Sequence, residues 1–332
     1  MFWNDKIKEK GQAEIAIILM AALVGLVIYA VTKTPGGVVV RKEEEVRTVA
    51  EPRKEYHPSR TIAHLTQLTF TEENDIQPVP SPSGNLLAFT SSRTGNRDIF
   101  VMDLRGKKIA VSQKTFVEAM DSDPAWAPNE ESLFFSSDRV EARKIFRKDL
   151  ARFIVANVQV TRGLALDSTP HLSPDGKRIV YSSIPVTGTI RRSYIWTLDT
   201  VSGDMTQYTP GIQPHFSPSG KKIALVSNKT GNWDIWTFDF ETGEQVQLTT
   251  DPADDFDPAW SPDGKMIAFA SNRGGNTDIY IMNADGSELI EITTHPEVDR
   301  YPNWSADGTK LYLASYRTGN YDLFEITLKV GP

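Results

Sequence analysis

From residue 61 onward, short apolar segments alternate with polar turns rich in proline and glycine. The clearest stretch starts at Pro258 and reads PAWSPDGKMIAFASNRGGNTDIYIMNADGSELIEITT. It predicts four strands, over 258–261, 266–270, 278–282 and 289–293. In the turns between them, proline presets φ and glycine accepts positive φ. The second strand is apolar at nearly every position, as expected for a sheet buried on both faces.

This four-strand unit is repeated six times. Each copy is anchored by a proline followed two residues later by an aromatic or apolar residue and then, in five copies, by serine. The anchors are Pro78, Pro124, Pro170, Pro214, Pro258 and Pro302, at intervals of 46, 46, 44, 44 and 44 residues. Four short strands per roughly 45 residues are typical of propeller blades. The pattern predicts an all-β, six-bladed propeller of four-stranded antiparallel blades over 61–332.

The two ends of the repeat region predict how the ring closes. The last copy supplies only three strands before the chain ends. The segment His64-Leu65-Thr66-Gln67-Leu68-Thr69 precedes the first anchor and resembles Val246-Gln247-Leu248-Thr249 of a fourth strand. We therefore expect the amino-terminal strand to complete the last blade, which removes the exposed sheet edges of an open array.

A different pattern precedes the repeats. Residues 15–31 read IAIILMAALVGLVIYAV, an uncharged apolar run of 17 residues. That length is near the lower limit for crossing a bilayer as a helix, and no face of it is polar. Lys6, Lys8 and Lys10 precede the run and favour a cytoplasmic amino end. We expect a cytoplasmic tip and transmembrane helix over 1–33, a stalk over 34–60, and the propeller outside the cytoplasm.

Two families resemble parts of the chain. Lys10-Gly11-Gln12-Ala13-Glu14, followed by the apolar run, resembles the prepilin-type signals of archaeal pilin-like proteins; an uncleaved signal anchor is the alternative. The repeat of Pro258-x-Trp260-Ser261-Pro-Asp-Gly-Lys resembles TolB-type propellers. That resemblance implies a six-bladed propeller that binds proteins, peptides or glycans. The membrane run takes the place of the extra domain of TolB itself, which makes a TolB-type partner set doubtful.

The composition and the absence of several motifs argue against some classes of function. A formal net charge of −7 argues against nucleic acid as a partner, and the lack of cysteine excludes thiolate chemistry. The chain has no Gly-x-Ser-x-Gly, His-Glu-x-x-His or Gly-x-x-x-x-Gly-Lys motif. We expect no enzyme activity and no cofactor.

Acidic residues recur before the anchors, where the loops lead to the channel mouth. Five stand three residues before the proline and two stand one residue before it: Asp75, Asp121, Asp167, Asp255 and Asp299, then Asp123 and Asp257. One interpretation is that they cap repeated turns through backbone N–H groups. The other is an acidic ring that attracts a cation or a basic peptide.

Two further groups are candidates. His171 and His215 follow the anchoring proline in neighbouring blades; they are either satisfied channel histidines or two ligands of a metal. The loops of blades two and three depart from the repeat and carry Arg139, Arg143, Lys144, Arg191 and Arg192. These basic residues predict a partner surface, with drift in solvated loops as the alternative.

Together these observations predict a membrane-anchored, extracytoplasmic TolB-like scaffold that binds a protein or peptide. The alternatives are a propeller enzyme that acts on a glycan or lactone through a channel metal, and a pilin-like surface subunit.

Overall fold

The computed structural model describes residues 16–21, 26–34, 37–42, 62–106, 110–150, 157–186 and 192–329. The chain divides into two compact units, Met1–Glu55 and Tyr56–Pro332.

In the first unit, the backbone forms three antiparallel strands: β1 (Ala16–Ala21), β2 (Leu26–Thr34) and β3 (Gly37–Lys42). The structure thus has strands where the sequence predicted a helix over 15–31. An apolar run without polar positions has no period that separates helix from strand, and its Ile and Val residues favour strands. No helix in the described ranges is long and apolar enough to cross a bilayer. The prepilin-like stretch Lys10–Glu14 and residues 43–60 of the predicted stalk lie outside the described residues.

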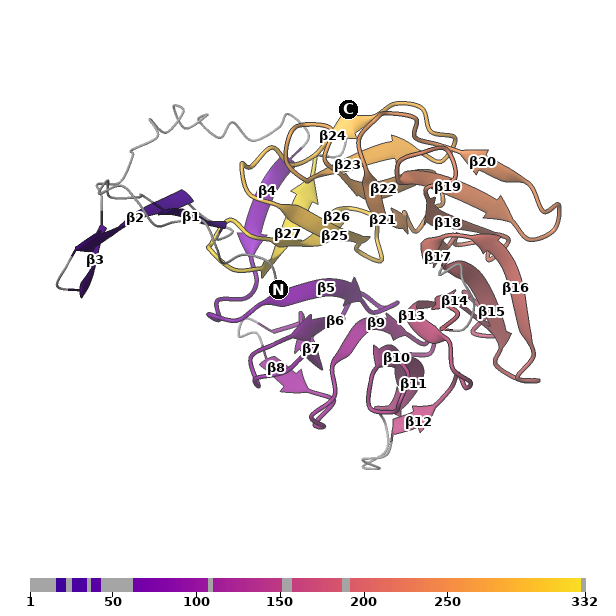
Figure 1. Ribbon diagram of the computed structural model, residues 1–332. Helices are drawn as coiled ribbons and strands as arrows, with labels where there is room; N and C mark the ends of the chain where they lie inside the picture. Colours follow the sequence, from indigo (N-terminus) through magenta and orange to yellow (C-terminus); the bar gives the residue numbers. More distant parts are fainter. Residues whose placement is uncertain are drawn as a thin grey trace. The chain divides into compact units, whose positions relative to one another are not determined.

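The second unit is a propeller of six four-stranded antiparallel sheets (Figure 1). Blade 1 has β5 (Asp75–Pro80), β6 (Leu86–Ser91), β7 (Asp98–Asp103) and β8 (Ala110–Gln113), and blade 2 has β9 (Asp121–Trp126), β10 (Ser132–Ser137), β11 (Lys144–Asp149) and β12 (Asn157–Gln159). Blade 3 has β13 (Leu166–Leu172), β14 (Arg178–Ile184), β15 (Tyr194–Asp199) and β16 (Met205–Pro210), and blade 4 has β17 (Ile212–Phe216), β18 (Lys222–Ser227), β19 (Asp234–Asp239) and β20 (Gln245–Gln247). Blade 5 has β21 (Asp255–Trp260), β22 (Met266–Ser271), β23 (Asp278–Asn283) and β24 (Ile290–Glu291).

Blade 6 joins the two ends of the propeller, as the sequence predicted. It consists of β25 (Asp299–Trp304), β26 (Lys310–Ser315), β27 (Asp322–Leu328) and β4 (Ile62–Gln67). The register pairs His64 with Thr327 and Gln67 with Phe324. Beyond the pairing, Thr69 Oγ1 donates to Asp322 Oδ1 at 3.0 Å and accepts the Leu323 N–H at 2.9 Å. These contacts fix the closure at the point where the chain has no covalent link.

Apolar side chains from the second and third strands fill the space between neighbouring blades. Between blades 4 and 5, for example, Val226 and Ile235 pack with Ile267 and Phe269, and all four are fully buried. Burial of each such side chain stabilises the fold by about 1.5–3 kcal/mol. The apolar runs that predicted two-sided burial are therefore the blade-to-blade interfaces.

Every innermost strand contains a β-bulge at its anchoring proline. The residue before each proline has positive φ, between 51° and 58°: Gln77, Asp123, Thr169, Gln213, Asp257 and Tyr301. The register with the second strand shifts at these points. Proline has no N–H to give to the ladder, so an irregular pairing is favoured there. The bulges aim these six side chains at the propeller axis, where the channel opens.

Candidate functional site

The innermost strands enclose an axial channel with two openings. One, here called the wide opening, is a cavity of about 450 Å³ lined by the turns that follow the first strands. The other, the narrow opening, is a cavity of about 200 Å³ lined by the six bulge residues and five of the six prolines that follow them. Four residues line both cavities and form the waist: Val79, His171, His215 and Asn303. The candidate site is therefore a channel with a mixed polar and apolar waist.

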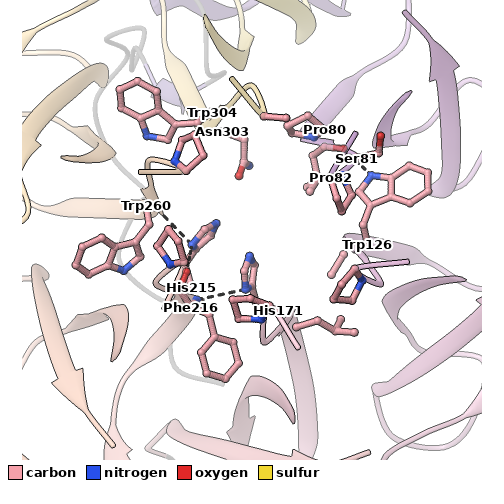
Figure 2. Close-up of a pocket in the computed structure, with 18 of the residues that line it drawn as sticks. Pro80, Ser81, Pro82, Trp126, His171, His215, Phe216, Trp260, Asn303 and Trp304 are labelled. Atoms are coloured by element: carbon pink, nitrogen blue, oxygen red, sulfur yellow. Dashed lines mark hydrogen bonds between the residues drawn. The ribbon is translucent and has the colours of Figure 1, made fainter. Parts of the chain in front are cut away.

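The waist side chains point into the channel, whereas the indoles beside them point away from it. Figure 2 shows His171, His215 and Asn303 directed at the opening, with Trp126, Trp260 and Trp304 directed outward between the blades. The Trp126 indole donates to the Val79 carbonyl at 2.9 Å, and Trp304 donates to the Ala259 carbonyl at 3.1 Å. The Trp126 and Trp304 indoles thus each join their blade to the preceding one, whereas the buried Trp260 Nε1 has no hydrogen-bond partner among the described residues.

The two histidines lie against each other. Their ring centroids are 3.8 Å apart, with an interplanar angle of 38°. His171 Nδ1 accepts the Phe216 N–H at 3.2 Å, so its proton is on Nε2. His215 Nδ1 lies 3.1 Å from the Phe216 carbonyl and 3.4 Å from the Trp260 N–H. Each ring is therefore held by the backbone of the next blade, with its other nitrogen free to meet a channel occupant.

Both imidazoles are neutral at physiological pH. Burial lowers the pKa of His215 to about 4, although its bond to the Phe216 backbone opposes this. Burial also lowers the pKa of His171 well below its usual value, and the neighbouring His215 lowers it further. Two imidazole rings at this distance could not both carry a charge without strong repulsion. The described residues contain no group of three His, Cys, Asp or Glu side chains that could hold a metal ion.

Asn303 is the third polar residue of the waist and faces the two histidines across the channel. Its Nδ2 donates to the Pro78 carbonyl at 3.0 Å, across the boundary between blades 6 and 1. Its place in the repeat is that of the histidines, one residue after the proline. Alignment of the six anchors would have identified Asn303 as a residue of the channel wall. Only the two histidines at the equivalent positions were predicted, because imidazole is a common metal ligand.

At the narrow opening, two matching networks lie three blades apart. Gln77 donates to Asp123 Oδ1, and Arg143 donates to Asp123 Oδ2 at 3.3 Å. Three blades on, Gln213 donates to Asp257 Oδ1 at 2.5 Å, and Arg300 donates to Asp257 Oδ2 at 2.9 Å.

In both networks the glutamine also accepts the aspartate N–H at 3.0 Å, which supports the left-handed backbone of the bulge. The two aspartates and Arg143 were predicted as site residues from the sequence, whereas both glutamines and Arg300 were not. Gln77 and Gln213 occupy the same bulge position as the aspartates, and that equivalence was the available signal.

Four of the predicted acidic residues lie away from the channel in buried ion pairs. In each, an arginine from the next hairpin donates to both carboxylate oxygens and to a serine; we call this the arginine clamp. The clamps are Arg93 with Asp75, Arg139 with Asp121, Arg273 with Asp255 and Arg317 with Asp299. All four carboxylates are fully buried. Their repetition reflects the structure of the blade, with arginine side chains in place of the predicted backbone partners.

Asp167 has the same place in blade 3, but a different cation meets it. Lys144 Nζ lies 3.0 Å from Asp167 Oδ2, and only 1% of the lysine and 4% of the aspartate side chain is exposed. Lys144 occupies the position that Asp98, Asp234, Asp278 and Asp322 hold in other blades. All seven predicted aspartates therefore pair with an arginine or lysine. These seven residues therefore do not form a ring of free carboxylates at the channel mouth.

The predicted basic sector is likewise dispersed. Arg139 belongs to a clamp and stacks over Phe146 at 4.7 Å, and Lys144 is buried. Arg143 faces Asp123 at the narrow opening, and Arg192 is exposed. Arg191 lies outside the described residues. The loop of blade 2 differs from the repeat in most of its residues. Arg139 nevertheless comes two residues after Ser137, just as Arg93 comes two residues after Ser91, so it keeps the position of the clamp arginine.

A family model described as the TolB beta propeller domain matches residues 61–207 and 155–331. The chain belongs to this family. The bulged innermost strands and the clamps above are thus features of a TolB-type propeller in this chain. No curated protein matches it.

Solved structures share the fold at low identity. The TolB-type chain is similar to a putative TolB from Agrobacterium tumefaciens, with 21% identity, a TM-score of 0.63, and coverage of 78% of this chain and 92% of that one. It is also similar to an oligogalacturonate lyase in complex with manganese, with 17% identity, a TM-score of 0.60, and coverage of 82% and 95%. A gluconolactonase from Xanthomonas campestris has 14% identity, a TM-score of 0.60, and coverage of 81% and 91%. At these identities the likeness shows the fold alone.

Proposed function

We propose that this TolB-type propeller is a non-enzymatic scaffold whose channel binds an extended segment of another protein. The observation that carries the proposal is the lining of the channel. Prolines of successive turns surround the wide opening: Pro82, Pro128, Pro174, Pro218 and Pro262. Grooves lined by rigid apolar side chains recognise extended segments, and a segment already in the polyproline II conformation loses least conformational entropy on binding.

The waist supplies polar groups that match a peptide backbone. His171 presents an Nε2–H donor, and Asn303 presents its Oδ1 acceptor from the opposite side of the channel, because its amide nitrogen donates to the Pro78 carbonyl (Figure 2). Val79 lines the same level as an apolar surface. A peptide carries one N–H and one carbonyl per residue, so both kinds of group at the waist have a partner.

We propose binding rather than catalysis for this channel. The metal route considered from the sequence needs a third ligand beside the two histidines, and the described residues supply no such cluster. The aspartates that were candidates for that role are held by arginine or lysine. The lyase and the lactonase share only the fold with this chain. Their activities therefore do not support an enzymatic role for this channel.

We further propose that residues 15–31 anchor the chain in a membrane, with the propeller outside the cytoplasm. Support comes from 17 uncharged residues in a row and from Lys6, Lys8 and Lys10 before them. In hydrocarbon, an open sheet would leave edge N–H and C=O groups unpaired, so this run would be helical in a bilayer. Alkaline carbonate extraction of native membranes should leave the chain in the pellet, and its release would refute the anchor.

A photo-crosslinking amino acid in the channel tests the binding role. We expect the crosslinker at Asn303 to give a discrete protein adduct in native membranes. The matched position is Val201, a residue 84% exposed in the turn between β15 and β16. An absence of adducts from Asn303, or the same adducts from both positions, would refute a protein in the channel.

A further inference from the structure

Exposed apolar side chains gather on one sector of the face that carries the narrow opening. They belong to the loops β8–β9 and β12–β13, the start of β13, and the hairpins β10–β11 and β14–β15 of blades 2 and 3. We call them the apolar arc: Phe116 (64% exposed), Val117 (42%), Met120 (48%), Val140 (37%), Leu164 (60%), Leu166 (37%) and Val186 (37%). A soluble surface rarely leaves so many large apolar residues together without a partner.

Hydrogen bonds between the loops make the arc continuous across two blades. Asn96 of blade 1 donates to the carbonyls of Val117 and Ala119 at 2.9 and 2.7 Å. The Met120 N–H donates to Asp138 Oδ1 at 2.7 Å, which joins that loop to the β10–β11 hairpin. The Asp167 N–H then donates to the Arg143 carbonyl at 2.9 Å, which joins the hairpin to the next loop. The arc is thus a connected surface on held loops.

The matching positions of blades 4 to 6 are polar. Phe116 follows a threonine after the fourth strand; this place is Phe70, 73% exposed, in the loop before blade 1, and Thr250 and Thr294 in the loops before blades 5 and 6. None of the described residues in the matching loops of blades 4 to 6 is an exposed large apolar side chain. The exposed apolar side chains of this face therefore belong to blades 1 to 3, with the apolar arc on blades 2 and 3, rather than to every copy of the repeat.

Acidic residues occupy the other side of this face. We call them the acidic arc: Glu72, Glu73, Asp251, Asp254 and Glu297, in loops β4–β5, β20–β21 and β24–β25. Within the described part of the chain none of the five forms an ion pair with a lysine or arginine, and Glu297 interacts electrostatically with His295. A group of carboxylates without lysine or arginine partners attracts positive charge.

We infer that this face docks a cationic amphipathic segment of a partner protein, with its apolar side on the apolar arc and its basic side chains toward the acidic arc. The negative charge of the acidic arc favours a cationic partner over the other possible occupants. An anionic bilayer surface would be repelled by the acidic arc, and the same face of a second copy of this chain would bring five more carboxylates. The inference rests on the proposed protein-binding role, but it concerns the rim of the narrow opening and does not require the channel to be filled.

A single fluorescent label can test all three occupants, because the chain has no cysteine. The full chain carries Phe116→Cys with an environment-sensitive dye, in nanodiscs of phosphatidylcholine. The matched control is Val201→Cys. The probes are a short peptide with leucine on one face and lysine on the other, the same peptide with glutamate for lysine, and one with serine for leucine.

We expect the leucine–lysine peptide alone to shift the dye at Phe116→Cys to shorter wavelength, with no shift at Val201→Cys. In unlabelled protein, measured with a labelled peptide, Leu164→Ser should weaken binding roughly tenfold, as loss of one buried leucine contact implies. Asp251→Asn with Glu297→Gln should weaken binding several-fold at low salt, and the difference should vanish at high salt. Both sets of residues are exposed, so folding is retained.

Three outcomes overturn the inference. If the glutamate peptide binds as tightly as the lysine peptide, the face does not select its partner by charge. A dye at Phe116→Cys that is already buried in nanodiscs without peptide identifies lipid as the occupant. A shift that grows with protein concentration alone identifies a second copy. If the peptide response is lost while Asn303 still crosslinks to a protein, the channel proposal stands and only this docking surface fails.

Discussion

Replacing Arg273 with methionine tests whether the arginine clamps hold the blades. Arg273 donates to both oxygens of Asp255 at 2.9 Å, and its Nε donates to Ser271 at 2.8 Å. The Asp255 side chain is fully buried, and the Arg273 side chain is 14% exposed. The methionine variant therefore leaves a buried carboxylate without a cation.

The expected loss is large for a single side chain. Removal of one partner of a buried pair costs about 3–5 kcal/mol. We take the lower end, about 3 kcal/mol, because the guanidinium keeps some contact with water. For a domain of this size, that corresponds to a fall in Tm of roughly 6–12 °C. Thermal unfolding of the detergent-solubilised full chain, followed by tryptophan fluorescence, measures it.

Two comparisons make the result decisive. Lys265→Met removes a pair at 3.9 Å whose lysine is 81% exposed, so it should shift Tm very little. The double variant Arg273→Met with Asp255→Leu removes both charges and should recover much of the stability. The reasoning is refuted if Arg273→Met unfolds at the temperature of Lys265→Met, or if the double variant is as unstable as the single one.

Three further predictions follow from the same contacts. Lys144→Asp introduces the residue found at this position in four other blades. It should lower Tm by about 5 °C or more, because it places two carboxylates side by side at Asp167; an unchanged Tm would contradict the ion pair between Lys144 and Asp167. Thr69→Val should lower the free energy of unfolding, measured in urea, by about 1–3 kcal/mol, because it removes the hydrogen bonds of Thr69 to Asp322 Oδ1 and to the buried Leu323 N–H. His215, whose pKa is lowered to about 4, contributes stability that is complete above pH 6.5, its usual pKa, and is lost as the pH falls from 6.5 toward 4. Since Asp278, with a pKa raised to about 7, contributes the opposite slope, the test is the difference between wild type and His215→Asn, whose Tm should fall less over this range; parallel curves would contradict a buried neutral imidazole.

The sequence predicted the propeller because the repeat carries its own geometry. Proline and glycine mark the turns, two-sided apolar strands mark the blade interfaces, and the unpaired amino-terminal strand predicted the closure with β27 that the structure confirms. The helix over 15–31 was a weaker inference, since a uniformly apolar run has no period and the structure has strands there.

The site was harder to predict because it depends on contacts between blades. Asp75 and Asp123 look alike in the sequence, yet one is buried in a clamp and the other lies at the channel mouth. The difference arises from the bulge at the proline, which turns the second of them toward the axis. Arg300 pairs with an aspartate 43 positions earlier, and no local spacing announces such a contact.

We propose that a protein segment occupies the axial channel of this propeller. An experimental structure of the full chain together with the partner captured by the Asn303 crosslinker would show whether it does. We expect an extended segment in the channel, with polar backbone groups within hydrogen-bond distance of His171 Nε2 and Asn303 Oδ1. A partner bound at the outer strands, with the waist filled only by water, would refute the proposal.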